Sequence, residues 1–159
     1  MGKERHDLLR RLAENEEAIG VLYREYASRY PEYDSFWLGL SADEKEHAGW
    51  IQILISTMDQ GDLFINQSRF NEHAILSYLA YLQREQAKLR QGDTTLLNAL
   101  AVTLYIEESL IERKYFEVFE SDAPKLKQVL ENLAAATRTH IEKARQALDS
   151  YKQLSASSE

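Results

Sequence analysis

Apolar residues recur at steps of three and four along most of this chain, a spacing that places them on one face of an α-helix. These seams and the breaks between them predict helices over residues 4–29, 42–61, 73–90, 95–120 and 124–153. Pro31 ends the first helix, because the residue before a proline is disfavoured in helical backbone. Ser41 and Glu44 have the spacing of a capping box, which predicts that the second helix starts near Ala42.

Helices in this order predict two long hairpins joined by a crossover. We expect an all-α fold, a four-helix bundle with a long crossover that contains an extra helix between the second and third core helices. The length of 159 residues is enough for one domain with a substantial core. We assign residues 1–154 to the bundle domain and residues 155–159 to a polar C-terminal tail.

Polar residues interrupt the four long seams at positions where apolar side chains are expected. They are Glu16, Glu44, His47, Glu108 and His140. A carboxylate or imidazole that faces a bundle core must be paired or metal-bound, because burying it alone costs several kcal/mol. The sequence therefore predicts one polar site shared by four helices.

The two halves of the chain are similar to each other around these residues. An offset of 92 residues carries Glu16 onto Glu108, and an offset of 93 carries Glu44 onto Thr137 and His47 onto His140. Such a repeat predicts a pseudo-two-fold axis between the two helices that carry the histidines, with the shared site on that axis. Thr137 is the position at which the halves disagree, because the repeat predicts a glutamate there.

Glu44 and His47 have a spacing that suits metal binding. Residues three apart lie on one face of a helix, so a carboxylate and an imidazole can reach the same ion. Metal sites in helical bundles combine Glu-x-x-His pairs from two helices with single glutamates from two others. The alternative is a metal-free network in which these polar groups pair with one another in the core.

At these residues the chain resembles the ferritin-like superfamily, and within it the rubrerythrin di-iron domain without the rubredoxin domain. The resemblance covers nearly the whole chain. It rests on four short motifs, which are Glu16 with Tyr23, residues 43–48, Glu108 with Tyr115 and Phe116, and residues 137–140. The resemblance implies a ferritin-like four-helix bundle with a di-metal site.

The resemblance also implies a role for each candidate residue. Glu16 and Glu108 would be terminal ligands, Glu44 a bridge between two ions, and His47 and His140 nitrogen ligands. A second bridging carboxylate belongs at position 137, where this chain has Thr. Two divalent ions bring a charge of +4 against −3 from three carboxylates, so we expect the metal pair to be bound more weakly. The implied metal is iron, with two ions in an intact site, while oxygen and nitrogen ligands also suit Mn or Zn.

Composition narrows the class of protein further. The net charge of −7 argues against a nucleic-acid partner, which calls for a basic surface. The chain has no cysteine, which excludes iron–sulfur clusters and the thiolate ligands of a rubredoxin domain, so a redox cycle would need an external electron donor. The charged N-terminal segment and the lack of a bilayer-spanning apolar run predict a cytoplasmic protein with no membrane partner.

Aromatic and apolar residues are more numerous than one bundle needs. Phe36, Trp37, Trp50 and residues 78–82 form either a homodimer face, which the resemblance favours, or the packing surface of the crossover helix. We expect a homodimer.

The leading functional hypothesis is a metal-binding protein with peroxide- or oxygen-linked oxidoreductase activity at a modified di-iron site. The alternatives are a non-enzymatic metal-binding or storage protein, and a metal-free ferritin-like scaffold that acts in protein interaction.

Overall fold

Helices make up most of the chain in a computed structural model, which describes residues 2–58, 60, 64–65, 72–109, 119–120 and 124–158. The helices are α1 (Gly2–Arg29), α2 (Asp34–Met58), α3 (Glu72–Gln91), α4 (Leu96–Glu108) and α6 (Pro124–Ala156), with a 3₁₀ turn, η1 (Pro31–Tyr33). Two short strands, β1 (Phe64–Ile65) and β2 (Phe119–Glu120), pair antiparallel. Apart from this short pairing, the prediction of an all-α fold is confirmed.

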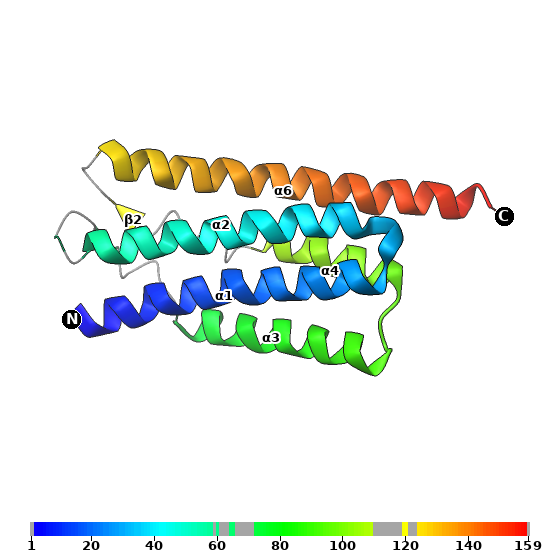
Figure 1. The fold of residues 1–159 in the computed structure, drawn as a ribbon, viewed down its shortest axis with the longest axis horizontal. Helices are drawn as coiled ribbons and strands as arrows, with labels where there is room; N and C mark the ends of the chain where they lie inside the picture. Colours follow the sequence, from blue (N-terminus) through cyan, green and yellow to red (C-terminus); the bar gives the residue numbers. More distant parts are fainter. Residues whose placement is uncertain are drawn as a thin grey trace.

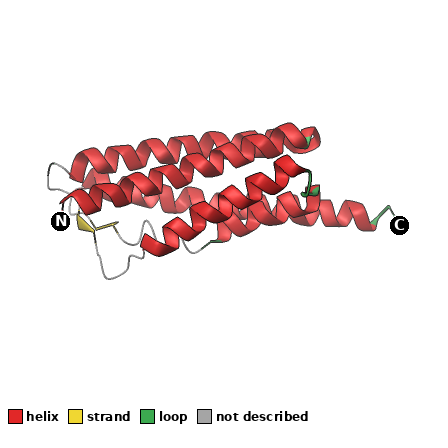
Figure 2. Ribbon diagram, turned by 90° about the horizontal axis from the view of Figure 1, so that it is seen from below, coloured by secondary structure: helices red, strands yellow, loops and turns green. Residues whose placement is uncertain are grey.

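The helices form a bundle in which α3 carries the chain back along its length. In Figure 1, α1 runs from left to right and α2 returns, α3 runs to the right again, and α4 and α6 form a second antiparallel pair. The helix α3 therefore lies in the predicted crossover, and α2 and α4 point the same way. The C-terminal end of α6 projects beyond the other helices in both Figure 1 and Figure 2, and α6 extends two residues into the predicted tail.

The start of α2 differs from the prediction by eight residues, because α2 begins at Asp34. Pro31 opens η1, in which the amide of Tyr33 donates to the carbonyl of Tyr30 at 3.0 Å, and the chain then enters α2 directly. Ser41 lies inside α2, and its hydroxyl donates to the carbonyl of Gly20 on α1 at 2.9 Å. The capping-box prediction is therefore wrong, since Ser41 makes a helix–helix contact.

The predicted break between α3 and α4 is confirmed and has identifiable chemistry. Gly92 follows α3 with a φ of 81°, a left-handed conformation that glycine adopts at little cost. The amide of Asp93 donates to the carbonyl of Lys88 at 2.9 Å, which closes the helix end. Thr95 then caps α4, since its hydroxyl accepts from the amide of Asn98 at 3.1 Å.

The helix α4 departs from the prediction in its length and in the face that it buries. Ser109 leaves the helical conformation with a ψ of 132°, so α4 ends at Glu108 and not near Glu120, and residues 110–118 lie outside the described residues. The side of α4 that carries Leu97 and the predicted site residue Glu108 is exposed. The buried residues are Ala99, Leu100, Thr103, Ile106 and Glu107. The reason is that α4 is apolar on nearly every face, so its pattern does not fix its rotation.

Two separate hydrophobic clusters hold the bundle together. Burying a large aliphatic side chain contributes about 1.5–3 kcal/mol, so each cluster stabilises its end of the bundle strongly. The cluster near the start of α1 contains Leu9, Leu12, Ala13, Ile51, Leu54, Ile75, Leu126 and Leu133. The larger cluster near its end includes Ile19, Leu22, Tyr23, Tyr26, Trp37, Leu40, Leu82, Leu100, Ile106 and Leu148.

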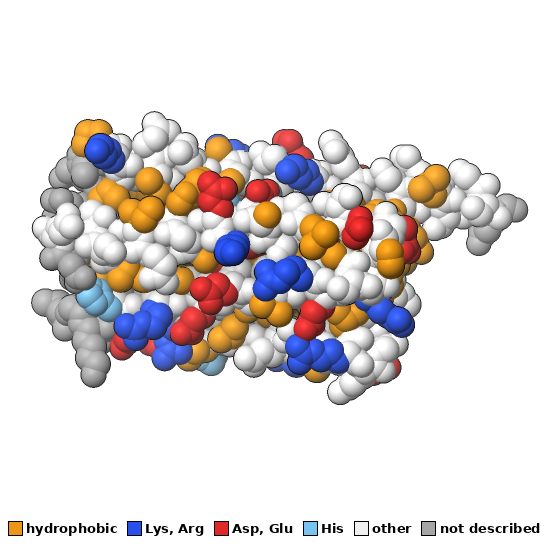
Figure 3. Space-filling view, in the orientation of Figure 1, with side chains coloured by type: hydrophobic (Ala, Val, Ile, Leu, Met, Phe, Trp, Pro, Cys, Tyr) orange, Lys and Arg blue, Asp and Glu red, His pale blue; other side chains and the backbone are white. Residues whose placement is uncertain are grey.

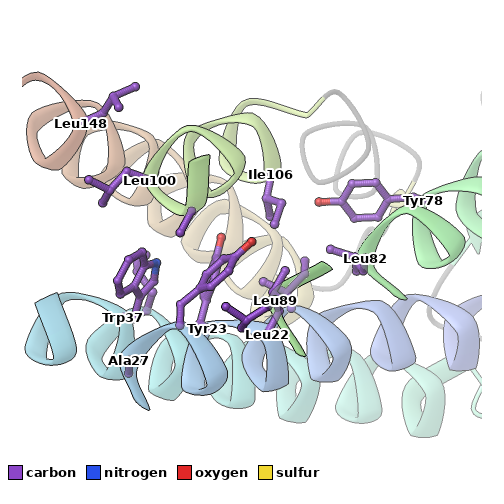
Figure 4. Packing of buried hydrophobic residues seen from close by; sticks show 14 residues of the cluster. Leu22, Tyr23, Ala27, Trp37, Tyr78, Leu82, Leu89, Leu100, Ile106 and Leu148 are labelled. Carbon is purple, nitrogen blue, oxygen red and sulfur yellow. The ribbon is translucent and has the colours of Figure 1, made fainter. Parts of the chain in front are cut away.

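The larger cluster accounts for several of the residues that were predicted to form either a homodimer face or the packing surface of the crossover helix. Trp37 is fully buried, and its indole N–H donates to the hydroxyl of Thr103 at 2.9 Å. Tyr78 and Leu82 of α3 are also buried, and Figure 4 shows them directed into the same cluster as Tyr23 and Trp37. These side chains pack within one chain, so they cannot form a dimer face. Homodimerisation itself stays a prediction.

The surface of the bundle carries both charged and apolar side chains. On the face shown in Figure 3, acidic and basic side chains are interspersed with isolated apolar groups over the described residues. Among the helices of the described part, none combines the length and the apolar character that crossing a bilayer requires.

Candidate metal centre

A layer of buried polar residues separates the two hydrophobic clusters. On α1, α2 and α6 the polar positions lie between residues of one cluster and residues of the other, as Glu16 does between Ala13 and Ile19 on α1. The layer consists of Glu16, Glu44, His47, Glu107, Thr137 and His140, each no more than 4% exposed. Four of the five predicted site residues therefore come together, on α1, α2 and α6.

The fifth predicted residue, Glu108, lies outside the layer. Its side chain is 42% exposed and forms an ion pair with Arg145 of α6, whereas the neighbouring Glu107 is 0% exposed. Successive residues on a helix are rotated by about 100° relative to each other, so the two glutamates cannot face the same core. The prediction that Glu108 lies on the seam is wrong, and Glu107 supplies the carboxylate of α4.

Glu44 occupies the middle of the layer, with one oxygen toward each histidine. Its Oε2 lies 3.2 Å from Nδ1 of His47, and its Oε1 lies 3.2 Å from Nδ1 of His140. The two imidazole rings are stacked with centroids 5.3 Å apart. Glu44 therefore joins the polar groups of α2 to those of α6.

The remaining two glutamates lie on opposite sides of this centre. Oε2 of Glu16 is 3.8 Å from Nδ1 of His47, and Oε2 of Glu107 is 3.4 Å from Nδ1 of His140. The layer therefore contains two three-residue groups that share Glu44. We name them the His47 subsite (Glu16, Glu44, His47) and the His140 subsite (Glu107, Glu44, His140).

Several ligand atoms in the layer have no hydrogen-bond partner among the described residues. They are both carboxylate oxygens of Glu16, Oε1 of Glu44, Oε2 of Glu107 and Nδ1 of His140. His140 Nδ1 lies close to two of these oxygens, but the contacts do not have hydrogen-bond geometry. A buried polar atom without a partner costs about 1–3 kcal/mol, so five in one layer indicate an additional binding group. Divalent ions fit this donor set of oxygen and nitrogen.

Two further side chains hold the His140 subsite from outside. The hydroxyl of Tyr23 donates to Oε1 of Glu107 at 2.6 Å. Nε2 of His140 lies 3.0 Å from Oδ2 of Asp43, so we assign the ring proton to Nε2 as donor to that carboxylate. Once the imidazole has lost its second proton, this tautomer leaves the Nδ1 lone pair directed into the layer. Such partners orient metal ligands and raise their basicity.

Burial and mutual contact shift the pKa values of the layer. Burial, reinforced by the charge of Glu44, raises the pKa of Glu16, and burial raises the pKa of Glu107. Burial acts in the same direction on Glu44, but its contacts with His140 and His47 outweigh it and lower the pKa of Glu44. Burial lowers the pKa values of the histidines, but the adjacent carboxylates outweigh it and raise them to about 10 for His47 and about 11 for His140. In the metal-free protein, protonated imidazoles therefore balance the carboxylates.

Thr137 contributes no ligand to the layer. It is 3% exposed, and its hydroxyl donates to the carbonyl of Leu133 one turn earlier in α6, at 3.1 Å. The structure therefore has no carboxylate at position 137, where the internal repeat predicts the counterpart of Glu44. The counterpart of Glu16 is Glu107, one residue before the Glu108 that the repeat predicts.

A pocket of about 180 Å³ connects the layer to the surface between α2 and α6. Both layer histidines line it, together with Asp43, Glu46, Trp50, Ala136, Thr139 and Lys143. At about 30 Å³ for each molecule of liquid water, this volume admits only small molecules or a hydrated ion.

Sequence reasoning missed Glu107 and Asp43. A signal for Glu107 was present, because Thr103 and Glu107 are four residues apart and share a face with Leu100. Nothing in the sequence alone pairs Asp43 of α2 with His140 of α6, which is 97 residues away.

No protein-family model, curated protein or solved structure that was compared with this chain matches it.

Proposed function

We propose that this chain is a ferritin-like protein of the rubrerythrin type that binds two divalent metal ions in the buried polar layer. One ion would be held by Glu16, Glu44 and His47, and the other by Glu107, Glu44 and His140. The observation that carries the proposal is the group of five buried ligand atoms that have no hydrogen-bond partner among the described residues. Glu44, His47 and His140 also place one ligand atom each within 4.8 Å of one another.

Iron is the proposed metal, with Mn or Zn as alternatives that the same ligands accept. Bound iron would supply redox chemistry toward oxygen or peroxide. The protein would hold the metal ligands in place through Asp43 and Tyr23, exclude bulk water with the two hydrophobic clusters, and admit small molecules through the pocket beside the histidines. The chain itself carries no cysteine, so we propose an external electron donor.

Metal analysis tests the proposal. The metal-free protein should take up two ions per chain from excess Fe(II) without oxygen. Glu44→Gln should lose both, because it removes the shared carboxylate charge while keeping the shape of the side chain. Glu17→Gln, at an exposed position of α1 that does not line the pocket, is the matched control and should retain them. Absence of binding in the unmodified protein would contradict the proposal.

The same metal-loading experiment distinguishes the proposed oxidoreductase from two other functions. A storage or carrier protein would retain iron without faster oxidation by hydrogen peroxide, whereas an oxidoreductase would oxidise protein-bound Fe(II) faster than free Fe(II). A metal-free scaffold would take up none, and its layer would be held by the imidazolium–carboxylate contacts of His47 and His140.

A further inference from the structure

We infer that the two subsites are unequal, and that the first metal ion occupies the His140 subsite, with Asp43 and Tyr23 as positioning residues. This inference rests on the proposed function, because it concerns the order in which the same layer takes up metal. Two observations assign the first ion, which are the hydrogen-bonding state of the ligand atoms in the two subsites and the partners that fix those ligands. The charge available to each ion then makes the second ion bind more weakly than the first.

The free ligand atoms favour the His140 subsite. Oε2 of Glu107 and Oε1 of Glu44 lie 3.4 and 3.2 Å from Nδ1 of His140, and all three atoms are buried without a hydrogen-bond partner in the described part of the chain. In the His47 subsite, Nδ1 of His47 is engaged in a hydrogen bond with Oε2 of Glu44 at 3.2 Å. An ion entering the His47 subsite must therefore break a hydrogen bond between two of its ligands, whereas the three ligand atoms of the His140 subsite have no hydrogen bond to break.

The His140 subsite is also the more preorganised. Asp43 holds the outer nitrogen of His140, and Tyr23 holds the outer oxygen of Glu107. The Tyr23 hydroxyl comes from the larger hydrophobic cluster, where Figure 4 shows its ring directed from α1 toward α4. A ligand whose orientation is already fixed loses less conformational entropy when a metal binds.

The His47 subsite lacks comparable support. Neither oxygen of Glu16 has a hydrogen-bond partner among the described residues, and its nearer oxygen lies 3.8 Å from His47. No carboxylate contacts the outer nitrogen of His47 within the described ranges. Glu16 and His47 would have to be ordered by the metal itself.

The carboxylate charge available to the second ion is smaller than that available to the first. An ion of charge +2 in the His140 subsite is balanced by the −2 of Glu44 and Glu107. A second ion adds +2, but only Glu16 adds a further −1, since position 137 is Thr. The uncompensated charge lies in a buried layer, where electrostatic interactions are stronger than in water. The second ion must therefore bind more weakly than the first.

Nitrogen NMR of the full chain labelled with ¹⁵N-histidine tests the order directly. The chain has four histidines, and His6 and His73 lie outside the layer and act as internal references. The titration uses Zn(II), which is diamagnetic and redox-inactive. The ¹⁵N chemical shift of Nδ1 of His140 should move to its metal-bound value over the first equivalent. Nδ1 of His47 should follow only as the second equivalent is added.

The possible outcomes separate the inference from the proposed function. A change of His47 first, or of both histidines in parallel, would overturn the order while leaving metal binding intact. No change at either histidine would overturn both.

Variants test the positioning residues with the same Zn(II) titration. Asp43→Asn and Tyr23→Phe should each weaken the first ion by about tenfold or more, the range found when partners of metal ligands are removed. The matched controls are Asp34→Asn, also on α2, and Tyr30→Phe, which removes a hydroxyl that donates to the carbonyl of Thr94. Both controls should keep the affinity for the first ion within about twofold of that of the unmodified protein. Circular dichroism verifies folding of each variant. Unchanged first-ion affinity in folded Asp43→Asn and Tyr23→Phe would overturn the positioning roles.

Discussion

At the scale of single residues, Glu44 links the two halves of the layer. It is fully buried, and each of its oxygens faces a different histidine. Glu16 and Glu107 each contact one histidine only, so they belong to separate subsites. Thr137 lies in the same layer and adds no charge. Each histidine therefore has one glutamate of its own and shares Glu44, and Thr137 stands where the internal repeat predicts a second shared carboxylate.

Glu107 and Glu108 are adjacent residues with opposite environments, which gives a matched pair of variants. Glu107→Gln should weaken the first metal ion by about tenfold or more, because it removes a ligand of the His140 subsite. Glu108→Gln should leave metal affinity within about twofold, since Glu108 is exposed and paired with Arg145. Competition with a chromophoric chelator measures both constants. Equal effects of the two substitutions would contradict the assignment of Glu107.

Thr137→Glu should strengthen binding of the second ion, because it supplies the negative charge that the layer lacks. We expect the affinity for the second ion to increase by at least about tenfold, measured by Zn(II) titration. The metal-free variant should unfold at a lower temperature, because an additional carboxylate is buried without a cation. Ala135→Glu, at an exposed position of α6 that does not line the pocket, is the control. An unchanged second-ion affinity would mean that the charge deficit does not limit binding.

Metal affinity should increase with pH. Because the pKa of His140 is raised to about 11 in the metal-free protein, its imidazole is protonated at pH 7, and a metal ion must displace that proton. Displacement of one proton gives about a tenfold gain in first-ion affinity for each unit of pH between pH 7 and pH 9. The raised pKa of Glu107 acts in the same direction. Zn(II) competition in buffered series measures the slope, and a pH-independent affinity would contradict it.

At the scale of helices, the sequence predicts what strong amphipathic patterns specify. The first helix was predicted to end at residue 29 and the crossover helix to run over residues 73–90, and both agree with the structure within one residue at these limits. The rotation of α4 could not be predicted, because apolar residues on all its faces leave two adjacent glutamates equally plausible as the core position. The start of α2 was predicted eight residues too late. Ser41 and Glu44 match the sequence pattern of a capping box, but the Ser41 hydroxyl instead makes a hydrogen bond to α1.

The pocket between α2 and α6 is the proposed route to the layer, and a side chain at its rim can close it. Thr139 lines the pocket and is exposed, so Thr139→Trp should slow metal uptake about tenfold without changing the number of ions bound. Arg138→Trp adds the same side chain at an exposed neighbouring position that does not line the pocket. Stopped-flow measurement of Co(II) uptake compares the rates. Equal rates in the two variants would mean that ions reach the layer by another path.

At the scale of the whole molecule, two hydrophobic clusters enclose one polar layer. The clusters supply the burial that stabilises the bundle, and they keep water away from the layer on two sides. The location of the layer was predicted from the polar interruptions of the seams, and four of its ligand candidates were named correctly as buried. Its division into two subsites, and the support from Asp43 and Tyr23, depend on distances between helices that a sequence pattern does not contain.

The central claim is that this layer binds a pair of metal ions around Glu44. Anomalous X-ray scattering from crystals of the Mn(II)-loaded protein tests it most directly. The expected map has two peaks about 3.5–4 Å apart, one beside Glu16 and His47 and the other beside Glu107 and His140, with Glu44 between them. A map without a peak between the two hydrophobic clusters, or with a peak only at exposed carboxylates such as Glu108, would contradict the claim.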